Sequence, residues 1–143
     1  MLKLLVPVDG SDPSARSIEY LLTKMPWLKQ EAEFHVLNVQ PHVPGGSHVA
    51  SVLGHDRLKQ YHHDEGMAAL KPAMQKLEAA GVPFKHHIVV GDAAAVIAEF
   101  AKERACDQIV MGTHGTGATA GFLLGSVALK VIQLSRVPVL LVK

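Results

Sequence analysis

Short apolar runs alternate along this chain with segments in which apolar residues recur at helical spacing. The runs cover residues 2–8, 33–39, 82–90, 108–111 and 137–142, and helical segments cover 12–24, 56–80 and 126–135, with another helix opening at 91–92. The runs are short and nearly unbroken, as expected of strands that are covered on both faces. This alternation predicts an α/β fold of three layers, in which a parallel five-stranded sheet lies between two layers of helices.

Capping and turn residues mark where the helices are expected to begin and end. Asp12 is the expected N-cap of the first helix, with Pro13 at its first position. Gly81 closes the long second helix, and Pro72 inside that helix predicts a kink or a break. Residues 40–55 contain Pro, Gly and His without a period, so they are expected to form a loop.

Apolar spacing also predicts which side of each helix faces the sheet. The expected core positions are Ile18, Leu21, Leu22 and Met25 in the first helix, Val96, Ile97, Phe100 and Ala101 in the third, and Val127, Ala128, Val131 and Ile132 in the last. Each set recurs at intervals of three and four residues, which places its members on one helical face.

Composition limits the class of protein. The 143 residues are expected to form one domain over 1–143. A formal charge of +1 argues against a nucleic-acid partner, and no apolar run reaches the length of a membrane span. Cys106 is the only cysteine, which suits a reducing compartment. The apolar run at 4–8 is too short for a signal-peptide core, so a cytoplasmic location is expected.

Unusual residues follow two of the expected strands. The first strand runs into residues 7–11 (PVDGS), and the fourth runs into the glycine-rich residues 111–117 and on to Gly125-Ser126. Ligands of open parallel sheets bind beyond the carboxyl ends of the strands. The chain therefore places a carboxylate, Asp9, and a glycine-rich loop where a ligand is expected.

The glycine-rich stretch has the composition of a phosphate-binding loop. Glycine lets backbone N–H groups approach an anion, and the amino end of a helix that starts at Gly125-Ser126 favours negative charge. Ser126 is expected either to cap that helix or to donate its hydroxyl to a phosphate. No acidic residue follows Asp107, so a polyphosphate would meet no local repulsion. A tight turn is the structural alternative for such a stretch.

Three further residues have open interpretations. Asp9 either serves a ligand or helps to cap the first helix. Pro7 removes a ladder donor near the end of its strand, and we interpret it as ending the ladder where a ligand begins. His114 lies inside the glycine-rich stretch and either contacts a phosphate or faces solvent.

Other ligand classes fit less well. Residues 115–120 match the dinucleotide pattern G-x-G-x-x-A, but no Asp or Glu follows to bind a ribose. The pattern G-x-x-x-x-G-K-[ST] of Walker-type hydrolases is absent. Histidines crowd residues 42–63, yet no pair has H-x-x-x-H spacing and no second cysteine supports a zinc site.

The glycine spacing carries a family resemblance. Gly112-x2-Gly115-x9-Gly125-Ser126 resembles the G-x2-G-x9-G-[S/T] signature of the universal stress protein family, in its ATP-binding branch. Residues 6–11 resemble that family's first strand and turn, and residues 124–127 and 137–142 resemble its last helix and strand. The resemblance implies a Rossmann-like nucleotide-binding fold with the strand order 3-2-1-4-5, which brings Asp9 and Gly112 to one crevice.

The resemblance also implies a ligand, ATP with Mg²⁺, and roles for individual residues. Asp9 would lie near the ribose and phosphates and help to hold Mg²⁺. Pro7, Val8 and Val39 would flank the adenine or ribose, Met111 and Gly112 would line the nucleoside, and Gly115, Gly125, Ser126 and Val127 would hold the phosphates.

Three functional classes stay open. The leading hypothesis is a stress-response regulator in which ATP occupancy alters a homodimer or a surface for another protein. The second is an enzyme that hydrolyses ATP or transfers its phosphate; it would be slow, because Asp9 and His114 are the only loop candidates for catalysis. The third is an interaction module with a vestigial pocket. A dimer is expected through the apolar edge strand 137–142, because open edges are normally avoided and the family commonly pairs.

Overall fold

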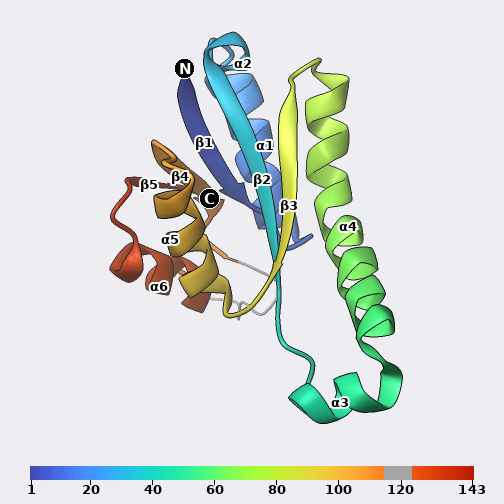
Figure 1. Ribbon diagram of the computed structural model, residues 1–143. Helices are drawn as coiled ribbons and strands as arrows, with labels where there is room; N and C mark the ends of the chain where they lie inside the picture. The colour runs from blue at the N-terminus through green and yellow to red at the C-terminus, as the bar shows by residue number, and fades with distance from the viewer. Residues whose placement is uncertain (115–123) are drawn as a thin grey trace.

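The sheet of the protein is parallel and has the strand order β3-β2-β1-β4-β5. The computed structural model describes residues 1–114 and 124–143. Its strands are β1 (Leu2–Pro7), β2 (Ala32–Gln40), β3 (Phe84–Val90), β4 (Gln108–Gly112) and β5 (Val139–Val142). Its helices are α1 (Asp12–Lys24), α2 (Leu28–Glu31), α3 (Gly46–Leu53), α4 (His55–Ala79), α5 (Ala93–Glu103) and α6 (Ser126–Leu134). The expected α/β class and strand order are confirmed (Figure 1).

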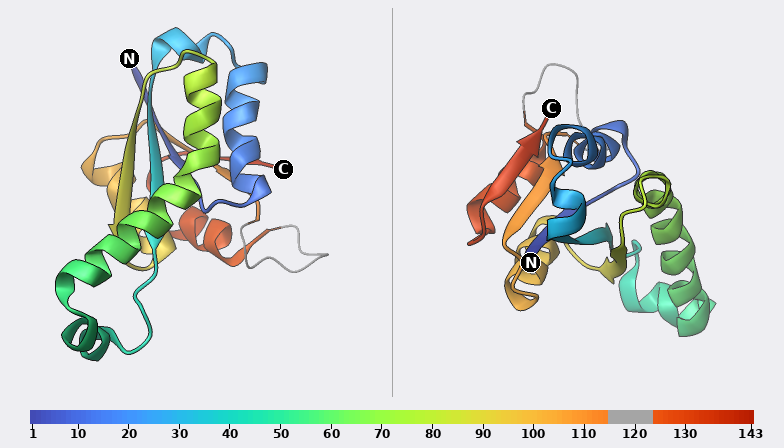
Figure 2. Two further views of the ribbon diagram at one scale, coloured as in Figure 1. Left: turned by 90° about the vertical axis from the view of Figure 1, so that its right-hand side faces the viewer. Right: turned by 90° about the horizontal axis from the view of Figure 1, so that it is seen from above.

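Alternate residues of the strands point to two helix layers and build two core clusters. The cluster under α1 and α4 includes Leu4, Val6, Phe34, Val36, Ile18, Leu21, Leu70 and Leu77. The cluster under α5 and α6 includes Leu5, Leu37, Ile109, Met111, Ile97, Phe100, Ala128 and Val131. Figure 2 shows these helix layers on the two sides of the sheet. The central strand β1 is buried from Leu4 to Pro7, as its unbroken apolar run predicts.

The sequence pattern predicted a loop over residues 40–55, but part of this segment is the helix α3. Gly45 and Gly54 flank this helix, both with positive φ, and they isolate a helix of only 8 residues. Ala50 is its only buried residue. A helix this short that buries so little leaves no apolar period in the sequence. Figure 1 shows α3 at the far end of α4, away from the sheet.

The N-cap of α1 is Ser11, so the expectation of Asp12 at that position is wrong by one residue. The Ser11 hydroxyl oxygen accepts a hydrogen bond from the backbone N–H of Ser14 at 3.4 Å. Asp12 is instead the first helical residue, where its carboxylate is favourable next to the positive end of the helix dipole. Both residues are good caps, and the sequence alone did not decide between them.

Pro72 does not break α4, which stays one helix of 25 residues. Leu70 and Ala73 are buried on either side of the proline, so tertiary packing holds the helix together where one hydrogen bond is missing. The helix axis bends along its length (Figure 2). Within the residues that the structure describes, no helix combines the length and the hydrophobicity of a membrane span.

Only half of the expected core face of α6 is buried. Ala128 and Val131 are at most 3% exposed, whereas Val127 is 39% and Ile132 43% exposed. The helix has 9 residues and lies beside the edge strand β5, so the sheet beneath it covers only a narrow stripe. The prediction that Val127 and Ile132 face the core is therefore wrong.

Gly66 allows α4 to pack closely on the edge strand β3. A Cβ atom at this position would lie 2.7 to 2.8 Å from three side-chain atoms of Ile88. Two of these atoms belong to the branch point of the side chain and have little freedom to move. The glycine therefore has a packing role in the middle of a helix, where glycine is otherwise unfavourable.

Replacing Gly66 by Ala is expected to destabilise the protein by about 1 kcal/mol, because overpacking outweighs the gain in helix propensity. In an Ile88→Ala background the same replacement is expected to be neutral or stabilising, because the clash is gone. Urea unfolding of the four proteins in this double-mutant cycle measures the difference. Equal effects of Gly66→Ala in both backgrounds would contradict the packing role.

Candidate functional site

The carboxyl ends of β1 and β4 separate soon after the two strands begin to pair. β1 pairs with β2 from Leu2 to Pro7, but it pairs with β4 only at Leu4 and Leu5. The order in which successive strands join the sheet also reverses here, because β2 and β3 lie on one side of β1 whereas β4 and β5 lie on the other. Such a switch point is where open parallel sheets bind ligands. A cavity of about 240 Å³ opens at this place.

Most of the site residues expected from the sequence line this one cavity. They are Pro7, Val8, Asp9, Val39, Met111, Gly112, His114, Gly125, Ser126 and Val127. Gly115 lies outside the described residues. The cavity is also lined by residues that were not expected from the sequence, which are Ser14, Leu37, Asn38, Ala93, Ile97, Thr113 and Ala128. Most of these follow from the fold alone, because they sit at helix starts or strand ends that the topology brings to the same edge.

Pro7 does not end the pairing of β1 with β2. The Val8 N–H donates to the Leu37 carbonyl at 2.8 Å, one residue beyond the proline. Successive strand residues direct their N–H groups to opposite sides, so the donor that Pro7 lacks would face β4. Pairing on that side has already stopped at Leu5. The expected end of the ladder is therefore found only on the β4 side, where the cavity opens.

Asn38 joins β2 to the connection that follows β1. Its side chain is 3% exposed and donates to the Val8 carbonyl at 2.9 Å. Its own amide oxygen accepts from the Gln40 side chain at 2.7 Å. An amide between the apolar residues Leu37 and Val39 was a signal in the sequence that could have identified Asn38, because a buried amide needs such partners.

Asp9 shapes the turn into α1. Its carboxylate accepts from the Ser11 backbone N–H at 2.9 Å and also from the Ser11 hydroxyl. The Asp9 N–H donates to the Ser14 hydroxyl at 3.4 Å. Asp9 thus helps to cap α1, which was one of its two interpretations, but it does so indirectly by holding the N-cap residue Ser11. Because Asp9 is exposed and lines the cavity, this arrangement also presents a carboxylate to a ligand.

The two ends of the β4–α6 connection are tied together. The Thr113 carbonyl accepts from the Gly125 N–H at 2.6 Å, and the Thr113 N–H donates to the Val142 carbonyl at 3.1 Å. The Thr113 hydroxyl also lies 3.0 Å from His114 Nδ1. These bonds set the amino end of α6 against the end of β4. The N-cap of α6 is Gly125 and not Ser126, and it makes no side-chain cap.

Gly112 has a packing role that does not involve a ligand. A Cβ atom there would lie 2.7 Å from the Pro13 carbonyl oxygen and 2.9 Å from its carbonyl carbon. A shift of backbone atoms at the start of a helix is costly in free energy. The glycine therefore lets β4 approach the first turn of α1, which closes one wall of the cavity.

Apolar and polar side chains both line the cavity. Leu37, Val39, Ile97 and Met111, which belong to or pack against one core cluster, line the part that is called the apolar end below, and Asp9, His114 and Ser126 line the part that is called the polar end. The first N–H groups of α6 have no partners within the helix and favour an anion.

A carboxylate also lies near α6, contrary to the sequence expectation. Lys130 Nζ lies 3.7 Å from Asp92 Oδ2, and Asp92 caps α5. No acidic residue follows Asp107 in the sequence, but the fold brings α5 and its cap Asp92 alongside α6. Over residues 1–114 and 124–143, no group of three or more His, Cys, Asp or Glu side chains is placed to bind a metal ion.

Comparisons with known proteins agree with this fold. A model of the universal stress protein family matches residues 1–143. The universal stress protein MJ0531 of Methanocaldococcus jannaschii is 34% identical over 142 residues, which cover 99% of this chain and 81% of that protein. The solved structure of protein MJ0577 from the same organism has a TM-score of 0.78 at 29% identity, and the match covers 99% and 95% of the two chains. A universal stress protein in complex with cAMP has a TM-score of 0.69 at 28% identity, with 99% and 97% covered.

Replacing Gly112 by Ala is expected to lower the free energy of unfolding by about 1–3 kcal/mol even without any ligand, because its Cβ would press on the Pro13 carbonyl. Urea unfolding of the ligand-free protein measures this effect. Unchanged stability together with a loss of ligand binding would mean that the glycine serves the ligand and not the packing.

Proposed function

The chain belongs to the universal stress protein family, and from this premise we propose that it binds ATP with Mg²⁺ in the cavity between β1 and β4. The observation that carries the proposal is the cavity itself, which joins an apolar end to the amino end of α6. A nucleotide has the matching division into a flat apolar base and an anionic phosphate chain. The relative solved in complex with cAMP supports an adenine ligand.

The apolar end suits the base and the ribose. Leu37, Val39 and Ile97 come from β2 and α5, and Met111 closes this end from β4. Small ligands are usually held by such apolar walls with a few polar groups that fix orientation. Pro7 and Val8 precede Asp9 in the chain and line the cavity as well, and the ribose would lie beside them.

The polar end suits phosphates. Gly125, Ser126 and Val127 present the first N–H groups of α6, and the resemblance adds Gly115. His114 lines the same end and would contact a phosphate oxygen. These groups recognise negative charge through backbone N–H donors and the helix dipole rather than through a lysine or arginine.

Mg²⁺ would be bound by Asp9 together with phosphate oxygens. Magnesium in nucleotide sites usually takes one or two carboxylates and completes its shell with phosphates and water. The single carboxylate Asp9 fits that pattern, because the ligand would supply the remaining oxygens. The cation would also remove the repulsion between Asp9 and the phosphates.

We further propose that the protein is a cytoplasmic, nucleotide-dependent regulator that works as a homodimer and contacts another protein. Slow ATP hydrolysis or phosphate transfer is a second candidate, because Asp9 and His114 line the polar end. Among the described residues no arginine lines this cavity, so charge neutralisation in a transition state would depend on Mg²⁺. An interaction module with a vestigial pocket is the third, and it would bind no nucleotide.

Replacing Val127 by Glu is expected to weaken ATP binding by about tenfold or more, because a carboxylate at the cavity would repel the phosphates. Ile132→Glu is the matched control, since Ile132 is on the same helix, is similarly exposed at 43% against 39%, and does not line the cavity. Calorimetric titration with ATP and Mg²⁺, and separately with AMP, measures both variants.

Equal weakening by the two variants would show that the charge acts at a distance and that the cavity is not the site. No binding by the wild-type protein, with nucleotide carried over from expression excluded, would favour the interaction module. Turnover at ordinary kinase rates that Asp9→Ala abolishes would favour the enzyme.

The dimer is expected to form by pairing of β5 with β5 of a second copy. The carbonyls of Pro138 and Val142 bond to β4, so the N–H groups of Val139 and Leu141 face the open edge. Val139→Pro removes one outward donor and is expected to weaken the dimer by about tenfold or more. Val139→Thr keeps both the shape and the N–H group and serves as the control. Sedimentation equilibrium measures the change, and a monomeric wild-type protein would refute this interface.

A further inference from the structure

A chain of hydrogen bonds joins β2 to the edge strand β3 on the face that α5 covers. Glu33 Oε1 lies 2.8 Å from His35 Nε2, and His35 Nδ1 lies 2.9 Å from His87 Nε2. The two imidazole planes are only 11° apart. His35 is 3% exposed, so both of its ring nitrogens depend on these protein partners rather than on water.

The Glu33 carboxylate at one end of this hydrogen-bond chain fixes which ring nitrogens carry a hydrogen. A carboxylate only accepts, so His35 Nε2 carries a hydrogen and donates it to Glu33. In neutral His35 the other nitrogen, Nδ1, is then bare and accepts from the Nε2–H of His87. The chain is complete when neither imidazole is charged.

One additional proton leaves this chain of hydrogen bonds intact, whereas two additional protons break it. If His35 Nδ1 takes the first proton, it becomes the donor, and His87 shifts its own hydrogen to Nδ1 and accepts through Nε2. If His87 is protonated as well, two N–H groups face each other across 2.9 Å with like charges. The hydrogen bond is then lost and is replaced by repulsion.

The surroundings keep Glu33 as an acceptor and oppose the second proton on His87. Lys85 Nζ lies 3.2 Å from the Glu33 carboxylate, and the bonds from Lys85 and His35 hold the pKa of Glu33 below its usual value. Burial, followed by the nearby charges of His35, Arg104, His86 and Lys85, lowers the pKa of His87 to about 4.

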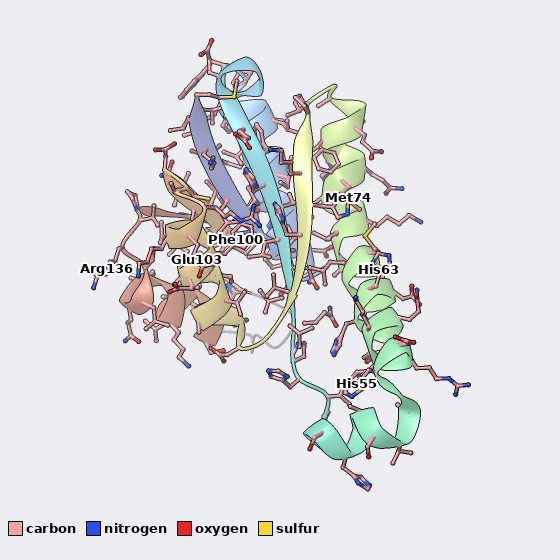
Figure 3. The ribbon with its side chains drawn as sticks, in the orientation of Figure 1. His55, His63, Met74, Phe100, Glu103 and Arg136 are labelled. Carbon is pink, nitrogen blue, oxygen red and sulfur yellow. The ribbon has the colours of Figure 1, made fainter. Side chains whose placement is uncertain are left out.

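From α5, the ring of Phe100 covers His87. The two ring centroids are 4.8 Å apart, and the Arg104 guanidinium carbon lies 5.2 Å from the centroid of the same phenyl ring. Figure 3 shows Phe100 between α5 and the sheet. An aromatic ring therefore replaces part of the water around the imidazole pair, and the nearby cations Arg104 and Lys85 oppose a second positive charge.

We propose that Glu33, His35 and His87 form an acid-sensitive latch, which is closed with at most one proton added to the imidazole pair and is opened by the second. Its opening would weaken the attachment of β3, because β2 is the strand with which β3 pairs among the described residues. His87 stands opposite Leu37 in the ladder, and Leu37 lines the cavity. Acid would thus loosen the wall of the apolar end.

The direction of the pH effect follows from the two states of His87. An unfolded histidine has a pKa of about 6.5, against about 4 in the folded protein, so the unfolded chain binds more protons between these values. The contribution of neutral His87 to stability is therefore complete above about pH 6.5 and is lost as the pH falls toward 4.

The test compares His87→Gln with His86→Gln by urea unfolding of the full chain at about pH 7.5 and about pH 4.5. A glutamine amide at position 87 donates to or accepts from His35 Nδ1 without taking a proton. His86 is the control, because it precedes His87 on the same strand, is exposed, points to the opposite face and is only a minor one of the charges that act on His87. Between the two pH values, the folding equilibrium of the wild type and of His86→Gln is expected to weaken by about tenfold or more relative to that of His87→Gln.

Equal pH dependence in all three proteins would overturn the latch. If His87→Gln does not fold at neutral pH, nitrogen-15 NMR of the wild-type imidazoles provides the second test. The latch requires His87 to titrate well below the ordinary value for histidine and β3 amide protection to fall in the same pH range. Titration at the ordinary value with β3 protection unchanged would overturn it.

Discussion

The early end of the β1–β4 ladder is the constraint on which the candidate site depends. Pairing stops at Leu5, while on the other side of β1 it continues past Pro7. Backbone groups beyond the split still need partners, because a buried polar group without one is costly. Asn38 provides one by donating to the Val8 carbonyl, and Gly125 provides another by donating to the Thr113 carbonyl. Asn38 thus ties the end of β1 to β2, and Gly125 ties the end of β4 to the start of α6, while the cavity opens at the split between β1 and β4.

Several residues at the cavity therefore combine a packing role with a place in the candidate site. Gly112 leaves room for the first turn of α1, and Asp9 holds Ser11, which caps that helix. Both also line the cavity. A substitution at either position changes the stability of the ligand-free protein as well as the site, so loss of binding in such a variant has meaning only beside a measurement of stability.

The two edges of the sheet are built from different chemistry. At β5 the strand and the neighbouring α6 carry apolar side chains, some of them well exposed, which suits association with a second copy. At β3 the inner face is held to β2 by an imidazole pair and a carboxylate, whose bonding depends on protonation. Hydrophobic contact varies little with pH, whereas a histidine pair responds directly to it.

The sequence by itself determined the elements with strong periods and the edge at which the ligand residues meet. The alternation of strand and helix predicted the layers, and the family resemblance implied many of the residues that line the cavity. Tertiary structure decided the rest. It placed α3 within residues 40–55, kept Pro72 inside a helix, exposed half of the α6 face and brought His35 to His87 across 52 positions of sequence. The physical reason is that periodicity and capping act between residues close along the chain, whereas burial and cross-strand hydrogen bonds depend on which elements become neighbours.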